Sequence, residues 1–238
     1  MTIRVIEQKG TYMRKIIIGG IMASVFGLLA PQTIQAQGTT YVSNLGQSSA
    51  GSLAVGSDSW LAGVFQTGTN PGGYVLNSIQ LAMTDAVGST GGFMVMLYAP
   101  ASGSFLPGSS LGTLNGSLNP VTSGLYTYTP AANLTLAPRT TYSIVLTAGT
   151  TVANGAYEWS YAGINSYNPT DDWGTLSGVL GGAWTSSNGS SPWIGNEGAF
   201  PQFAVNGTGV PEPGVLGLFV LGGFFLAWRC RKAKGSVW

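Results

Sequence analysis

Histidine is absent from this 238-residue chain, and cysteine occurs once, at Cys230. Without histidine the chain cannot build a Ser-His-Asp or Cys-His nucleophile system, nor a His-ligated metal site. A single cysteine forms neither an intramolecular disulfide nor a thiolate metal cluster. We therefore predict a non-enzymatic protein with no cofactor, no catalytic residue and no metal-ligating residue, although catalysis by carboxylates alone stays open in principle.

Charge is also scarce, at 7% of residues, and it is unevenly distributed. Between residues 37 and 209 the single basic residue is Arg139, against six carboxylates, so this stretch has a net charge of −5. A segment with almost no Lys or Arg cannot bind phosphates through counterion release, which excludes nucleic acid as a partner. The other basic residues are at the two ends: Arg4, Lys9, Arg14, Lys15, Arg229, Arg231, Lys232 and Lys234.

The N-terminal end has the pattern of a secretory signal peptide. Basic residues 14–15 precede an apolar run at 16–30, Pro31 ends it, and Ala36 offers a small residue at a cleavage position. A buried core helix and an uncleaved membrane anchor are the alternatives.

We predict that residues 1–36 are a signal peptide whose true start is Met13. The secretory translocon would export the chain, and signal peptidase would cut it between Ala36 and Gln37.

The C-terminal end has three parts in series: a Val210-Pro211-Glu212-Pro213 box, an apolar run to Trp228, and a basic tail at 229–234. As a helix, residues of about 213–228 would measure about 24 Å, slightly short of a ~30 Å hydrocarbon core. Interfacial Trp228 and a snorkelling arginine would cover the gap. The tail should hold this end in the cytoplasm and the body outside, through its four basic residues: Arg229, Arg231, Lys232 and Lys234.

This end resembles the PEP-CTERM sorting signal of Gram-negative-type bacteria, which the membrane protease-transpeptidase exosortase recognises. The box, the Leu/Gly/Phe-rich run and the basic cluster occur in the family's order over residues 210–234. Cys230 stands where the family usually has Arg or Lys. The two prolines deny helix to the box, and the resemblance implies that Glu212 is its recognition determinant. The alternative is a proline-rich linker before an ordinary tail anchor.

Between these ends, residues 37–209 have strand patterns and no helical period. Turn residues separate the apolar alternations, as at Asn70-Pro71-Gly72-Gly73. We therefore predict an all-β domain, an antiparallel β-sandwich of jelly-roll-like type, flanked by the signal peptide and a single transmembrane helix. The expected strands include residues 60–65, 78–84, 93–98, 125–129, 141–147, 157–161 and 202–206.

The body also resembles, more loosely, the choice-of-anchor domains found upstream of surface-sorting tails. The cues are residues 134–146, 157–161 and 201–207, in that order. Because no biochemical activity defines such domains, the resemblance implies a fold and a location but no ligand.

Aromatic side chains offer a second functional hypothesis, since sugar rings stack on Trp and Tyr. Trp173, Trp184 and Trp193 lie in Gly/Ser/Asn-rich stretches, so we expect them to be exposed and to be the possible glycan contacts. The alternating set around Trp159 (Tyr157, Trp159 and Tyr161) is expected in the core.

Asp171 and Asp172 could bind Ca²⁺ through their carboxylates, but Asp-Asp in a loop more often forms turns. The Asn-Gly pairs indicate turns, and we expect Cys230 to have no functional role. The sequence thus predicts a non-enzymatic exported protein that is membrane-anchored with its body outside, processed by exosortase, and left at the cell surface or in the extracellular matrix. The alternative is a glycan-binding module for exopolysaccharide.

Overall fold

The computed structural model describes residues 38–174, 182–211 and 214. Every named element in this part of the chain is a β-strand, and all strand pairs are antiparallel, which confirms the all-β prediction. Apart from Gly214, the predicted signal peptide, membrane helix and basic tail lie outside the described residues and stay predictions. Within those residues no helix has the length and apolar character needed to cross a bilayer.

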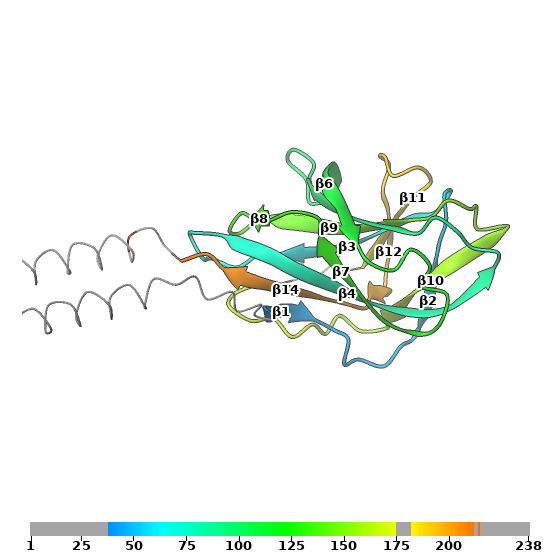
Figure 1. Ribbon diagram of the computed structural model, residues 1–238, viewed down its shortest axis with the longest axis horizontal. Coiled ribbons are helices and arrows are strands. Elements are labelled where there is room, and N and C mark those ends of the chain that lie inside the picture. The colour runs from blue at the N-terminus through cyan, green and yellow to red at the C-terminus, as the bar shows by residue number, and fades with distance from the viewer. Residues whose placement is uncertain (1–37, 175–181, 212–213, 215–238) are drawn as a thin grey trace, which may run out of the picture. The chain divides into compact units, whose positions relative to one another are not determined.

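Fourteen strands follow one another along the described chain (Figure 1). Each segment predicted as a strand overlaps one of them. The strands are β1 (Thr39–Ser43), β2 (Gly51–Val55), β3 (Trp60–Gln66), β4 (Tyr74–Gly88), β5 (Met94–Pro100), β6 (Pro107–Asn115), β7 (Gly124–Pro130), β8 (Leu134–Leu136), β9 (Thr141–Thr147), β10 (Gly155–Ala162), β11 (Ala183–Ser186), β12 (Ile194–Asn196), β13 (Phe200–Pro201) and β14 (Phe203–Gly209).

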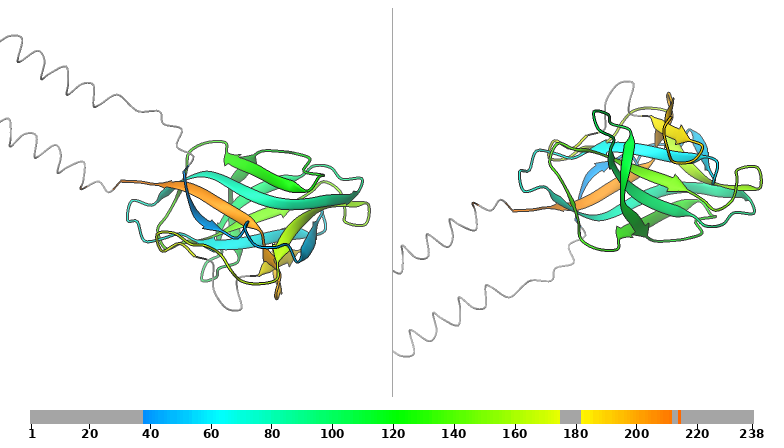
Figure 2. Two further views of the ribbon diagram at one scale, coloured as in Figure 1. Left: turned by 90° about the horizontal axis from the view of Figure 1, so that it is seen from below. Right: turned by 90° about the horizontal axis from the view of Figure 1, so that it is seen from above.

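The strands form a curled antiparallel sheet with two facing layers. Ten of them pair in the order β1-β14-β4-β7-β6-β5-β9-β3-β11-β12, while β10 pairs with β2, β4 and β13, and β8 pairs with β4. This order of strands passes from one layer to the other between β7 and β6, which are joined by only two residue pairs, Leu114–Pro130 and Asn115–Thr129. Strands β14 and β4 thus lie in one layer, and β9 and β3 in the other (Figures 1 and 2). The fold is sandwich-like, as expected, and the jelly-roll detail stays a prediction.

The main core fills the space between the layers because alternate residues of each strand point to the same face. On β4, Ile79 and Leu81 are fully buried, and Ile144 and Leu146 of β9 join the same apolar cluster. Trp159 of β10 is 0% exposed, and its Nε1 donates a hydrogen bond to the backbone oxygen of Gln202 at 3.0 Å. The core position predicted for this side chain is confirmed.

A second, smaller apolar cluster covers the outer face of the β3–β9–β5 layer. Ala62, Met96 and Val145 point away from the main core and are buried under Trp193. Strands β3 and β5 have apolar residues on both faces, and β9 has six buried residues in succession, which include the polar Ser143 and Thr147. A loop must therefore cover their outer side, because an exposed apolar face would otherwise stay in water.

The buried tyrosines predict a loss of stability in alkaline solution. Burial, the largest cause in each case, raises the pKa of Tyr41, Tyr128, Tyr142 and Tyr167 above the ordinary value of 10.0. Above about pH 10 the unfolded chain loses these protons before the folded chain does, so rising pH favours unfolding. The melting temperature of the body should fall above pH 10 and show no histidine-linked change near neutrality. Ionisation of these four tyrosines at pH 10 in the still-folded body, identified by comparing tyrosinate absorbance with that of Tyr→Phe variants, would contradict this burial.

Candidate functional site

The last strand of the body ends where the predicted sorting box begins. Strand β14 lies between β1 and β4, and it pairs with β4 from Phe203–Leu81 to Gly209–Tyr74. Phe203 is fully buried, so the strand is anchored in the core. The first residue of the box follows Gly209 directly. The fold therefore determines the point at which the box leaves the body.

Val210, the first box residue, is hydrogen-bonded to the body through both of its backbone polar groups. Its N–H donates to the backbone oxygen of Gly73 at 3.0 Å. Its carbonyl oxygen accepts a hydrogen bond from the side-chain Nδ2 of Asn70 at 3.1 Å. Val210 is half-buried, and Pro211 after it is exposed. The free part of the box therefore begins at Pro211.

The segment that holds Val210 is the turn Asn70–Gly73, which precedes β4. Asn70 shapes this turn: its backbone oxygen accepts from the N–H of Gly73 at 2.9 Å, and its Oδ1 accepts from the N–H of Gly72 at 3.1 Å. Asn before Pro and Gly is favourable for this reason, since its side chain mimics a backbone turn. Gly73 has a φ of 75°, a conformation that favours glycine. The Asn70 side chain is thereby oriented toward both Gly73 and Val210.

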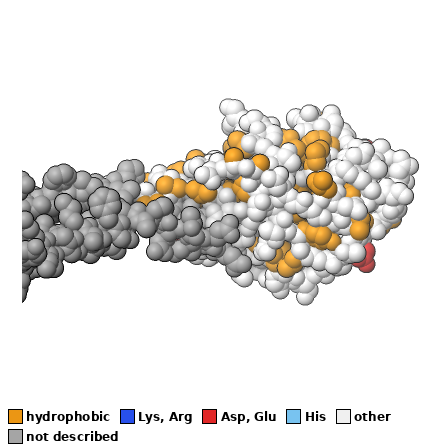
Figure 3. Space-filling view, in the orientation of Figure 1, with side chains coloured by type: hydrophobic (Ala, Val, Ile, Leu, Met, Phe, Trp, Pro, Cys, Tyr) orange, Lys and Arg blue, Asp and Glu red, His pale blue; other side chains and the backbone are white. Residues whose placement is uncertain are grey.

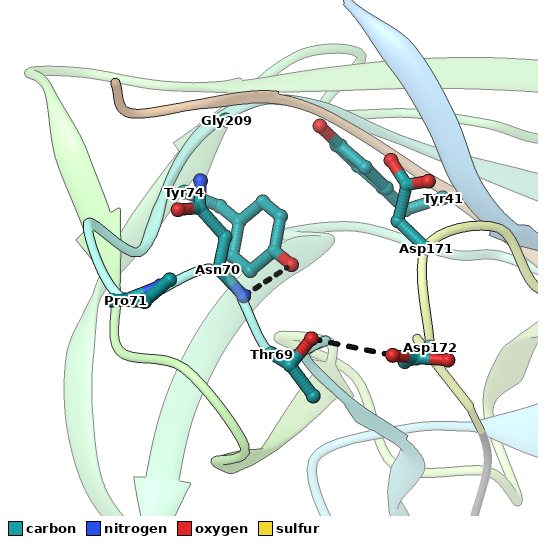
Figure 4. A pocket seen from close by; sticks show the side chains of 8 residues that line it. All are labelled: Tyr41, Thr69, Asn70, Pro71, Tyr74, Asp171, Asp172 and Gly209. Atoms are coloured by element: carbon teal, nitrogen blue, oxygen red, sulfur yellow. Dashed lines mark hydrogen bonds between the residues drawn. The ribbon is translucent and has the colours of Figure 1, made fainter. Parts of the chain in front are cut away.

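A hollow of about 480 Å³ lies beside this exit (Figure 4). Two carboxylates enter it: Asp172, which accepts a hydrogen bond from Thr69 at 3.2 Å, and Asp171, which lies near Tyr41. Burial raises the pKa of the Tyr41 hydroxyl, and the Asp171 carboxylate raises it further. The complete lining is Tyr41, Thr69, Asn70, Pro71, Tyr74, Asp171, Asp172 and Gly209.

Trp173, expected to be exposed, is instead buried beneath this hollow, with 2% of its surface accessible. It stacks on Tyr41 at a ring distance of 4.6 Å and on Phe65 at 5.7 Å, and it meets the edge of Tyr74 at 4.8 Å. The expectation of exposure is wrong here because three separate strands supply an aromatic slot for the indole. Trp173 therefore anchors the adjacent Asp171–Asp172 segment to the core.

The other two predicted glycan contacts lie on the outer face of the β3–β9–β5 layer. Trp193 is buried there, so its expected exposure is also wrong, and Trp184 is half-buried with its ring 5.6 Å from that of Phe105. Both side chains cover apolar residues of the sheet. Contact with a glycan is untested for all three tryptophans, but none of the three stands fully in solvent.

Asp171 and Asp172 both have left-handed backbone angles, with φ of 54° and 60°. Asp tolerates this conformation in turns, in agreement with the turn interpretation of the pair. In the described part of the chain, no three side chains among His, Cys, Asp and Glu are grouped so as to hold a metal ion. Binding of Ca²⁺ at these two residues is untested.

Several predicted site residues fall outside the described part of the chain. They are the two residues of the signal-peptide junction, two residues of the box and the basic residues of the tail: Ala36, Gln37, Glu212, Pro213, Arg229, Arg231, Lys232 and Lys234. By contrast, sequence reasoning recognised the turn at Asn70 but missed its contact with the box. No pattern in the neighbouring sequence predicts a hydrogen bond between residues 140 positions apart.

Comparison with known protein families supports the interpretation of this end of the chain. Residues 209–232 match the model of the PEP-CTERM protein-sorting motif. No curated protein matches the chain. The predicted sorting motif is thus confirmed, and it begins at the last residue of β14.

Proposed function

We propose that this chain is exported by a Gram-negative-type bacterium and sorted by exosortase through its C-terminal motif. The observation that carries the proposal is the junction at Gly209, where the folded body ends and the matched sorting motif begins. The fourteen strands precede the motif along the chain, and only Gly209 belongs both to β14 and to the motif. Sorting and folding therefore involve almost separate parts of the chain.

The proposed route uses both ends of the sequence. A signal peptide at residues 1–36 directs the chain to the translocon and is removed by signal peptidase between Ala36 and Gln37. A helix at about 213–228 then stops transfer, and the basic residues at 229–234 keep the end of the chain in the cytoplasm. The body stays outside, first at the membrane and then, after processing, at the cell surface or in the extracellular matrix.

We further propose a non-enzymatic role for the body, with a choice-of-anchor-type fold. The absence of histidine supports this role, as does the sparse charge of the surface. On the face drawn in Figure 3, the backbone, uncharged side chains and scattered hydrophobic patches make up most of the surface of the body, and acidic side chains show only near its edge. Neighbouring copies with so little charge repel one another weakly, which suits a component of a matrix.

The glycan-binding alternative receives less support from the body. Trp173 and Trp193, two of its three predicted contacts, are buried and hold other apolar side chains. A stacking platform for a sugar needs an accessible aromatic face. We therefore retain the matrix role as the main proposal.

Substitution of Glu212 by Ala tests recognition by exosortase. The change alters neither the length of the motif nor its apolar run, but it removes the only charge in the box. In cells that contain exosortase, the variant should accumulate as a membrane-bound precursor from which only the signal peptide has been removed. Immunoblots of membrane and medium fractions, with and without exosortase, measure this directly.

Glu197→Ala is the matched control, because Glu197 is an exposed glutamate in the body outside the motif. It should be processed like the wild type. If Glu212→Ala is also processed normally, the box acts only as a linker, and the recognition role proposed for Glu212 is wrong.

A further inference from the structure

The turn Asn70–Gly73 is hydrogen-bonded to the backbone of Val210, the first residue of the sorting box. The Val210 N–H is bound to Gly73, and its carbonyl is bound to the Asn70 side chain. The same Asn70 amide also donates to the Gly73 oxygen at 3.0 Å, so one side chain links Gly73 to Val210. We name the two residues and their bonds to Val210 the exit clamp.

Gly72 provides independent evidence that Val210 is packed tightly against the turn. A Cβ added at Gly72 would overlap the Val210 carbonyl oxygen, and its next nearest neighbours would be two further atoms of Val210. Nothing else lies as close to that position. The turn thus approaches Val210 both by hydrogen bonding and by direct packing, and the absence of a side chain at Gly72 is what permits it.

The clamp competes with any enzyme that reads Val210. An enzyme that binds an extended segment does so largely through main-chain N–H and C=O groups, as when a peptide adds a strand to a sheet edge. In the folded body these two groups of Val210 already have partners. The enzyme can therefore reach the whole box only after Val210 separates from the turn, or else it must use Pro211 and the residues beyond.

We propose that Asn70 is a positioning residue that limits access to the sorting box by holding Val210 on the body. This inference rests on the proposed exosortase processing. The clamp opens in a local equilibrium, and processing proceeds from the open form. Weakening the clamp should therefore speed processing while leaving the fourteen strands in place.

Asn70→Asp is the sharpest test, because the two side chains have nearly the same shape. Aspartate keeps the side-chain oxygen that accepts from Gly72 and the backbone bond between Gly73 and Asn70, but it loses both donor bonds of the amide, one to Gly73 within the turn and one to Val210. Loss of the bond to Val210 alone should raise the processing rate about fivefold, since one such bond contributes about 1 kcal/mol net. Pulse-chase labelling of the full chain in cells with exosortase measures the rate.

Asn154→Asp is the matched control: it makes the same change of charge in an exposed turn next to Gly155, which pairs with the far end of β4. It should leave the rate unchanged. A second variant, Gly72→Ala, displaces Val210 by steric overlap instead of by loss of a donor. It should also speed processing, and Gly46→Ala, where an added Cβ meets nothing within 4 Å, should not.

Backbone hydrogen exchange of Val210 separates the clamp from the processing step. Both clamp variants should exchange this amide faster than the wild type at an unchanged melting temperature. If Val210 exchanges faster but processing does not accelerate, the inference is overturned while the proposed function stands. Equal exchange in the wild type and both variants would show that no clamp exists. A wild-type chain that exosortase does not process would overturn the proposed function, and with it the role of Asn70 in access.

Discussion

A chain that ends at Pro211 should leave the membrane fraction almost completely and collect in the medium as a folded body. Removal of residues 212–238 deletes the apolar run and basic tail that we propose to stop transfer, while the proposed signal peptide remains. The truncation keeps all fourteen strands and both backbone hydrogen bonds of Val210. Immunoblots of the two fractions, with circular dichroism of the released protein, measure the effect.

The matched control changes the tail without shortening the chain. Replacing its four basic residues by neutral ones removes the topological bias but keeps the apolar run, so retention should fall only in part. The residues are Arg229, Arg231, Lys232 and Lys234. A truncated chain that remains in the membrane fraction would mean that the body or the N-terminal segment holds it there, and our account of anchoring would be wrong.

Trp159→Ala should cost the body about 3–5 kcal/mol of unfolding free energy, the range for a large buried aromatic. The side chain is completely buried, and its ring lies against Gly63, where an added Cβ would be 2.9 Å away. Because Gly63 has no side chain to move into the space, the cavity should stay largely unfilled. The Gln202 oxygen keeps its bond from the Ala82 N–H, so the loss is mainly one of packing.

Urea denaturation of the body measures this loss by linear extrapolation. Trp184→Ala is the control, since that indole is half-buried on the outer face and should cost about 1 kcal/mol. Equal losses in the two variants would contradict the distinction between the main core and the outer cluster. A loss of the size predicted for Trp159 is a large part of the usual 5–15 kcal/mol of a domain, so the variant should also reach the surface in smaller amounts.

The strands that the sequence predicted are those whose signal lies within the strand itself. Residues 141–147 have the alternating pattern of a strand, and they coincide with β9 (Thr141–Thr147). By contrast, β6 was missed, because its residues are small, polar and mostly exposed. It is a strand because β5 pairs with it along its length and β7 pairs with its end. A segment of this kind takes its conformation from its partners.

The sorting motif could likewise be predicted because it is contiguous. Its box, apolar run and basic tail act through order and spacing along the chain, and the match at 209–232 needs no folded neighbour. Burial of a tryptophan depends instead on residues that are distant in the sequence. Trp173 lies in a loop with no strand pattern, and its burial depends on Tyr41, Phe65 and Tyr74, which three other strands bring together.

The sequence by itself therefore determined the all-β class, most of the central strands and the position of the sorting motif. Only the tertiary structure decided which tryptophans are buried and how the motif leaves the body. The reason is the range of the interactions: alternation and motif order depend on neighbouring residues. The bond between Asn70 and Val210 instead joins positions 140 residues apart. It forms because β14 pairs with β4 and brings Gly209 beside Tyr74, next to the turn that holds the first residue of the box.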